Sequence, residues 1–429
     1  MQELGTTGLK RTSGFIYDEF LVRLQGIQGI KTYREMSDND PVIGAVLYAI
    51  EKVITRLEWR VDPYKDQSQD GDPDDADVET AAFIESCLND MSDSWDSTLS
   101  QILSMIIYGW SFHEIVYKRR VGPDQKDPTK RSKFSDGKIG WRKWAIRGQE
   151  TLYLWTFDAD GGIQGMQQVD PYTGHGRIDI PIEKALLFRT TTVKNNPEGR
   201  SLLRNAYRPW YFKKRIEEIE AVGIERDLAG LPVALVPPQL LSNAATSEER
   251  AALDAIKQIV RNVKRDEQEG IVFPLAYDPE TGNPAYDLKL LSTGGRRQFD
   301  TDAIIGRYDQ RIAMTVLADF LLLGHENVGS QALSVSKVDL FIRSLDAFLS
   351  EIAEVFNNHA IPRLMRLNGV DEAMSPTLTW STPKSVDLAS IGSFITSLAQ
   401  AGAPLFPDEN LEGYLRGIAG LPVGEAEGV

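Results

Sequence analysis

Two hydrophobic patterns organise the first half of the chain. Apolar residues recur at helical spacing in residues 37–54, 78–91 and 95–108, which predicts three helices. In other segments apolar and polar residues alternate between turn signals such as DADGG, which is typical of antiparallel strands. We therefore predict an α+β fold whose antiparallel sheet is built from local hairpins. The expected strands are residues 57–64, 111–120, 141–149, 151–158, 162–170 and 184–192.

The N-terminal residues carry two further signals. We expect residues 1–14 to form a flexible arm, and the helical periodicity of residues 15–30 predicts a helix there. The next helix should begin at Pro41, because proline favours the first helical position and Asp38 or Asp40 can cap the N-terminus.

Three long helices dominate the second half of the chain. The periodicity predicts them over residues 202–229, 299–323 and 334–361, the first about 40 Å long. The first of these helices is basic in its first half and acidic in its second half. Its charges allow a solvated helix or a contact with the acidic half of a neighbouring copy, and the resemblance stated below adds a third interpretation, a basic channel wall.

A compact αβ insert of residues 231–291 lies between the first two long helices. It begins with an expected strand, continues with a helix and ends with two more strands. The helix should start after Thr246, because Thr246 and Glu249 have the spacing of a capping box.

Composition narrows the classes of function. The chain has 47 lysines and arginines against 62 aspartates and glutamates, a net charge of −15, which argues against a tight grip on DNA phosphates. The single cysteine, Cys87, excludes an internal disulfide and lies among apolar residues, so we expect a buried structural thiol. No apolar run approaches the length that spans a bilayer, and we expect no membrane partner.

Motifs for catalysis or cofactor binding are absent from the sequence. It contains no phosphate loop, no dinucleotide-binding glycine pattern and no nucleophile elbow, and its four histidines have no metal-ligand spacing. Asp70, Asp72 and Asp74 resemble the start of a calcium loop but lack its glycine and its final glutamate. We therefore predict no catalytic residue, metal ligand or cofactor. Arg296 and Arg297, after a glycine pair, are either a phosphate contact or a solvated helix start.

Taken in order, the segments resemble tailed-bacteriophage portal proteins, most closely the Mu-type portal family. YREMSDNDPVIGAVLYAIEKVITRLEWRVDP, at residues 33–63, is similar to the opening of a portal wing, and IYGWSFHEIVYK, at 107–118, to its next strand. IPIEKALLFRT, at 180–190, and NPEGRSLLRNAYRPWYFKKRIEE, at 196–218, resemble the strand and helix start that lead into a portal stem. The resemblance covers roughly residues 30–370.

The resemblance implies a portal fold with an α+β wing, long stem helices, a small αβ clip insert and a long C-terminal helix. The corresponding divisions are an N-terminal arm and wing at 1–199, a first stem helix at 200–230, a clip at 231–292, a second stem helix at 293–323, a channel loop at 324–333, a long wing or crown helix at 334–368 and a C-terminal segment at 369–429.

The function that this resemblance implies is that of a portal, not of an enzyme. A homo-oligomeric ring, a dodecamer, would sit at one capsid vertex of the virion after assembly in the host cytoplasm. Double-stranded DNA would pass through its channel during packaging and ejection. The implied partners are terminase, a head–tail adaptor or connector and the major capsid protein. An acidic wall would let DNA slide, which agrees with the net charge.

The channel loop is the predicted site. By the resemblance it would line the narrowest part of the channel, and its lack of lysine and arginine limits any DNA contact to hydrogen bonding or steric hindrance. The alternative is a plain helix–helix turn. The predicted channel residues are Gly324, His325, Glu326, Asn327, Val328, Gly329, Ser330 and Gln331.

Two other classes of function remain open at this point. One is a metal-dependent enzyme acting on nucleic acid, which would need carboxylates converging in one pocket. The other is a structural adaptor that binds proteins through its long helices and has no channel.

Overall fold

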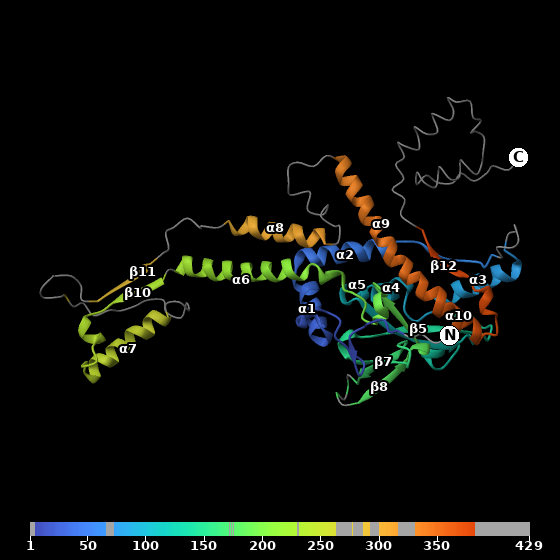
Figure 1. Ribbon diagram of the computed structural model, residues 1–429, viewed down its shortest axis with the longest axis horizontal. Coiled ribbons are helices and arrows are strands. Elements are labelled where there is room, and N and C mark those ends of the chain that lie inside the picture. Colours follow the sequence, from blue (N-terminus) through green and yellow to red (C-terminus); the bar gives the residue numbers. More distant parts are fainter. Residues whose placement is uncertain are drawn as a thin grey trace, which may run out of the picture. The chain divides into compact units, whose positions relative to one another are not determined.

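The computed structural model describes residues 5–65, 73–170, 172, 174, 176–229, 231–262, 277, 286–291, 300–315 and 331–381 (Figure 1). The described residues fall into two compact units. The first unit comprises the described parts of Met1–Arg204 and Val316–Val429, and the second those of Asn205–Thr315. The fold is α+β, as the hydrophobic pattern predicts.

The first unit opens with a hairpin rather than with the helix predicted over residues 15–30. Strands β1 (Arg11–Thr12) and β2 (Phe15–Ile16) pair, and helix α1 (Gly26–Asn39) begins ten residues after β2. The prediction was wrong because Gly14, with a φ of +89°, turns the chain back, and its carbonyl oxygen accepts a hydrogen bond of 3.0 Å from the amide of Trp155.

The predicted start of the second helix is confirmed. Helix α2 (Pro41–Thr55) begins at Pro41, and Asp40 is the N-cap, because its Oδ1 accepts hydrogen bonds from the amides of Val42 and Ile43, both at 3.0 Å.

Three further helices come before the larger sheets along the chain. They are α3 (Asp75–Asn89), α4 (Trp95–Ile102) and α5 (Ser104–Tyr108), close to the predicted bounds. Cys87 of α3 is buried in the main core, as predicted, and burial raises the pKa of its thiol to about 11. Asp74 caps α3 by accepting from the amide of Asp77, whereas Asp70 and Asp72 lie outside the described residues.

Six strands of this unit form two three-stranded antiparallel sheets instead of one sheet of local hairpins. The hairpin prediction holds for the meander β6 (Leu152–Phe157), β7 (Ile163–Val169) and β8 (Arg177–Pro181). In the other sheet, β4 (Trp110–Arg119) lies between β5 (Ile139–Arg147) and β9 (Ala185–Arg189). Along the chain, the meander therefore lies between β5 and β9, which belong to the same sheet.

The predicted long C-terminal helix is present but contains one wider turn. Helix α9 (Gln331–Val355) continues through a π-helical turn (Phe356–Ala360) into α10 (Ile361–Leu367). Pro362, near the start of α10, has no amide hydrogen for the regular ladder, which accounts for the wider turn before it. After α10, strand β12 (Thr377–Trp380) pairs with β3 (Trp59–Asp62), which comes from the start of the unit.

Within the part of the first unit that the structure describes, two apolar clusters make up much of the core. The larger one joins α2, α3, α4, β5, α9 and α10 around Trp141, Trp144 and Phe356. The smaller one joins the two sheets and the N-terminal hairpin around Trp110 and Trp155.

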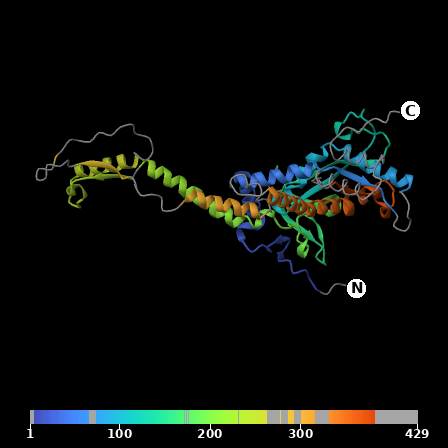
Figure 2. The same ribbon diagram turned by 90° about the horizontal axis from the view of Figure 1, so that it is seen from above.

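The second unit is a pair of helices that carries a small αβ element. Helices α6 (Tyr207–Ala229) and α8 (Thr301–Met314) lie side by side (Figures 1 and 2). Between them along the chain come β10 (Leu231–Leu235), α7 (Ser247–Asn262) and β11 (Asp287–Leu291), and the two strands pair antiparallel. The capping box of α7 is confirmed, since Thr246 and Glu249 exchange hydrogen bonds of 2.7 and 3.3 Å.

Candidate functional site

The predicted channel loop falls almost wholly outside the described residues. Helix α8 is described to Met314 and α9 begins at Gln331. Of the eight predicted channel residues, Gly324 to Ser330 lie outside the described residues, and Gln331 is the first residue of α9. Arg296 and Arg297 also lie outside them. The helix pair of the second unit and the segment of the first unit that precedes it in the chain are two separate candidate regions.

A buried ion pair sets the register of the helix pair. Lys213 Nζ of α6 lies 2.5 Å from Asp309 Oδ1 of α8, and 3% of the Lys213 side chain is exposed. Farther along, Glu220 of α6 accepts a hydrogen bond from the hydroxyl of Thr301. Residue numbers rise along α6 as they fall along α8, so the two helices are antiparallel. The Phe212 and Tyr308 rings stack between them, with centroids 6.4 Å apart.

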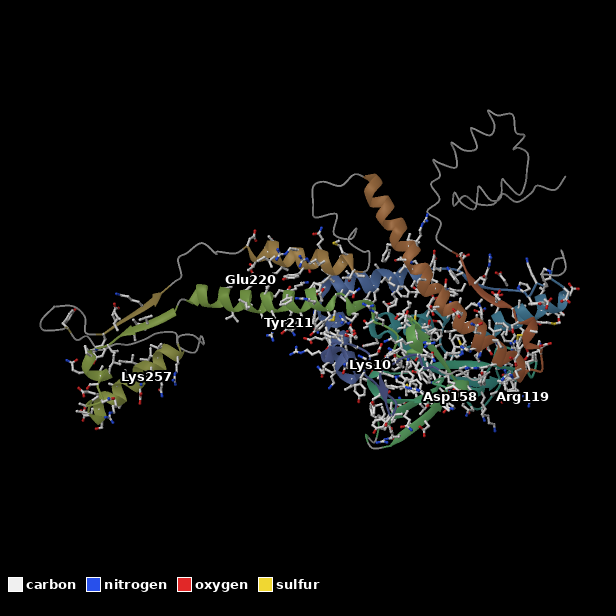
Figure 3. The ribbon with its side chains drawn as sticks, in the orientation of Figure 1. Lys10, Arg119, Asp158, Tyr211, Glu220 and Lys257 are labelled. Carbon is white, nitrogen blue, oxygen red and sulfur yellow. The ribbon has the colours of Figure 1, made fainter. Side chains whose placement is uncertain are left out.

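Charge is segregated along this helix pair. The first half of α6 lies beside the second half of α8, so both contribute cations to one end of the pair. Some of these cations lie over aromatic rings, as Arg208 does over Phe212 and Arg311 over Tyr308. Figure 3 marks Tyr211 in the basic half of α6 and Glu220 in the acidic half. The basic end contains Arg208, Lys213, Lys214, Arg215, Arg307 and Arg311, and the acidic end contains Glu217, Glu218, Glu220, Asp300 and Asp302.

Helix α6 also presents an exposed apolar ridge, made of Phe212, Ile219 and Val222. Successive members are seven and three residues apart, which places them on one face of the helix. Ile219 is 70% exposed, and the other two are exposed as well. Exposed apolar side chains that share one face of a helix favour a contact with another chain.

The segment before α6 is tied to the core of the first unit. Arg204 donates two hydrogen bonds, of 2.6 and 2.7 Å, to the carboxylate of Glu19. Burial raises the pKa of Glu19, but its hydrogen bonds from Arg204 and from the amide of Leu21 outweigh this, so the net pKa is lowered. Ser201 donates to the carbonyl oxygen of Ile107 at 2.5 Å. The chain therefore leaves the first unit from a fixed position.

Two glycines let this segment approach β4 closely. Gly109, with a φ of +93°, and Gly199, with a φ of +52°, face each other, and a Cβ on either would overlap a backbone carbonyl oxygen of the other strand of chain. Glu198, directly before Gly199, accepts a hydrogen bond of 3.4 Å from the indole of Trp155. Burial raises the pKa of Glu198 to about 7, so this carboxyl is largely protonated in mildly acidic solution.

The sequence analysis missed the residues that fix this geometry. Glu19 and Arg204 are 185 residues apart and Lys213 and Asp309 are 96 apart, and none of the four stands out by a local motif. The one available signal was the NPEGRS segment, whose proline and glycine indicate a fixed turn before a helix.

The described residues also bear on metals and membranes. Within them, no group of three or more histidine, cysteine, aspartate or glutamate side chains is placed to hold a metal ion. His113, the most buried histidine described, faces the Trp144 carbonyl oxygen at 3.3 Å, and burial lowers its pKa to about 4. No helix in the described ranges is long and apolar enough to cross a membrane.

Comparison with known families identifies the architecture. The model of the family described as portal protein of Mu bacteriophage matches residues 30–414, which span both units. The chain belongs to this family. It is therefore a phage portal protein, whose place is a capsid vertex.

Solved structures share the fold. A chain in the neck of an empty GTA particle, computed with C6 symmetry, has a TM-score of 0.50 and 10% identity, with 92% of this chain and 94% of that chain covered. A chain in the neck of a native GTA particle, computed with C12 symmetry, has a TM-score of 0.50 and 11% identity, with the same coverage. At these identities the similarity is one of fold.

Proposed function

We propose that copies of this chain form a closed ring around a channel that conducts double-stranded DNA into and out of the capsid. The observation that carries the ring is the exposed ridge of α6, in which Ile219 and Val222 stay exposed although Phe212 stacks on Tyr308 of α8. A ring covers such a ridge with the next copy in a head-to-tail contact. The C12 symmetry used for a neck of the same fold supports a dodecamer.

The parts of the chain take roles in this proposal that follow its order of elements. Residues 1–199 would form the N-terminal arm and wing, residues 200–230 and 293–323 the two stem helices, residues 231–292 the clip, residues 334–368 a long wing or crown helix, and residues 369–429 a C-terminal segment. The clip would meet terminase during packaging and the head–tail adaptor or connector afterwards, and the wing would meet the major capsid protein. The ring would assemble in the host cytoplasm and remain in the virion.

The loop from Gly324 to Gln331 would face the channel and hold DNA after packaging. Its two glycines and its polar residues support this role, as does its position between two helices. Arg296 and Arg297, which follow the clip, would offer a weaker phosphate contact. The ring itself would be a conduit without enzymatic activity or cofactor, because packaging would be driven by the separate terminase.

Genetic complementation tests this function. A phage that lacks the gene should make capsids without DNA, and the wild-type chain supplied in trans should restore filled particles. A chain lacking residues 326–330 should still form rings and begin packaging but should fail to retain a full genome. Filled capsids without any copy of the chain would contradict the proposal. Mg²⁺-dependent cleavage of plasmid by the purified chain would instead support the nuclease alternative.

A further inference from the structure

One region of the first unit carries a net positive charge, opposite in sign to the net charge of the whole chain. Residues 118–143, here called the basic lobe, comprise the end of β4, the loop after it and the start of β5. They contain ten lysines and arginines against three aspartates, a net charge of +7 in a chain of −15. Figure 3 marks Arg119 at the end of β4 in this lobe.

Buried charges hold the basic lobe in one conformation. Asp90, the C-cap of α3, accepts hydrogen bonds from the Ser132 hydroxyl at 2.6 Å and the Lys133 amide at 2.8 Å, and pairs with Lys118 Nζ at 3.0 Å. Arg120 is buried, pairs with Asp136 at 3.0 Å and lies 3.9 Å over the Phe134 ring. The loop is therefore a preorganised platform.

Carbonyl oxygens position the exposed cations of the lobe without neutralising them. Arg119 donates to the carbonyl of Gly137 at 3.1 Å, and Arg131 to that of Gln125 at 3.0 Å. Lys133 donates to the carbonyl of Asn89 at 2.6 Å. Among the described residues, the exposed lobe cation with a carboxylate within 4.0 Å is Lys130, 3.9 Å from Asp127. The exposed cations are Arg119, Lys126, Lys130, Arg131, Lys133 and Lys138.

The chemistry of the lobe fits phosphate better than a protein surface. Val121, 40% exposed, is its one exposed large apolar side chain, and all residues of the lobe are described. Protein interfaces are rich in aromatic side chains at their centre and poor in lysine. Single-stranded nucleic acid is bound by exposed aromatic rings that stack on bases, and the lobe exposes none of them.

We propose that the basic lobe binds the phosphodiester backbone of double-stranded DNA, independently of base sequence. The lobe would contact DNA inside the particle, so this inference rests on the proposed portal function. The net charge of the chain is −15, so a region of net charge +7 attracts the phosphate backbone more strongly than the chain as a whole does. Each phosphate contact releases counterions, so binding weakens steeply as salt rises.

Binding of a fluorescent DNA duplex to the full-length chain tests the proposal. The variant Lys126→Gln/Lys130→Gln/Arg131→Gln removes three exposed lobe charges. The matched control Arg250→Gln/Lys257→Gln/Arg261→Gln removes three exposed charges from α7. At about 50 mM KCl, fluorescence anisotropy should show roughly tenfold weaker binding by the lobe variant and unchanged binding by the control. The slope of log affinity against log salt should fall by about 0.9 for each lost contact.

Three results would overturn the lobe proposal: no duplex binding by the wild type, equal loss in both variants, or tighter binding of polyglutamate than of duplex. The last result would assign the lobe to an acidic protein. Light scattering of the same preparations keeps the two proposals separate. If rings form but the lobe variant binds DNA like the wild type, the result contradicts the lobe proposal and leaves the ring proposal intact. If no rings form but binding depends on the lobe charges, the result contradicts the ring proposal and supports the lobe proposal.

Discussion

Lys213 Nζ lies 2.5 Å from Asp309 Oδ1, and this ion pair joins α6 to α8 at a point where the lysine is almost wholly buried. Few lysines are buried to this degree without a carboxylate partner. The pair therefore sets the register of the helix pair on which the proposed stem depends, and the Thr301–Glu220 hydrogen bond farther along sets its antiparallel direction.

Breaking this pair should destabilise the second unit. Asp309→Asn removes the nearer of two carboxylates from the buried ammonium of Lys213, and Glu217 Oε1, at 4.0 Å, compensates only part of the loss. Because Asp309 is 24% exposed, we expect a loss of about 2 kcal/mol in the free energy of unfolding. The double variant Lys213→Met/Asp309→Leu should recover most of this loss, because neither partner is then buried alone. Urea unfolding measures both. A loss below about 0.5 kcal/mol for Asp309→Asn would mean that the pair behaves like a surface salt bridge.

Charges on the apolar ridge should block assembly without unfolding the chain. Ile219→Lys and Val222→Lys place an ammonium at exposed positions that the ring would bury, so helicity should be kept and large assemblies lost. Ala221→Lys is the matched control, since this exposed residue of the same helix points away from the ridge. Light scattering reads the mass of each variant. Normal assemblies in the ridge variants would show that the ridge is not the contact.

Glu198 should make the first unit less stable as pH rises. The ordinary pKa of a glutamate is 4.5, and the pKa of Glu198 in the folded chain is about 7. Between these two pH values the folded chain keeps a proton that the unfolded chain releases, so the free energy of unfolding falls as pH rises through this window. Glu198→Gln keeps an acceptor for Trp155 and removes the titration. We expect the variant to match the wild type near pH 4.5 and to exceed it by up to about 3 kcal/mol above pH 7.

Urea unfolding followed by tryptophan fluorescence across this pH range measures the effect. Glu79→Gln, on the exposed surface of α3, is the control and should follow the wild type at every pH. A constant difference between Glu198→Gln and the wild type at all pH values would show that Glu198 does not titrate in this window.

The close approach at Gly109 should not tolerate a side chain. In Gly109→Ala, the new Cβ would overlap the carbonyl oxygen of Glu198 and lie 2.9 Å from the amide nitrogens of Arg200 and Ser201, all backbone atoms. We expect a loss of at least about 2 kcal/mol in the free energy of unfolding.

Gly137→Ala separates this overlap from conformational strain. Gly137 also has a positive φ, of +73°, but no atom lies within 4 Å of the position of a Cβ. Its substitution should therefore cost only about 1 kcal/mol. Equal losses for the two variants in thermal or urea unfolding would show that the approach of Gly109 to residues 198–201 is looser than the structure indicates.

Local chemistry decided which parts of the fold could be predicted from the sequence. The caps at Asp40 and Thr246 depend on neighbouring residues, and both predictions are confirmed. The helix over residues 15–30 was wrong because contact with Trp155, far along the chain, favours a hairpin. The pairing of β4 with β9 and of β3 with β12 joins distant segments, so no local pattern could reveal it.

The candidate site was less accessible to such reasoning. The charge segregation of α6 is visible in the sequence, but its continuation in α8 depends on the antiparallel register that Lys213 and Asp309 set. The exposure of Ile219 likewise cannot be read from a helical period, which identifies an apolar face but not what covers it. The proposed channel loop lies outside the described residues and stays a prediction.

An electron micrograph of the purified full-length chain, with its mass measured by light scattering, tests the proposed ring most directly. We expect closed rings with a central hole, with Ile219→Lys present only as single chains under the same conditions. A chain that stays monomeric at every protein and salt concentration, or that forms assemblies without a hole, would contradict the portal ring proposed here.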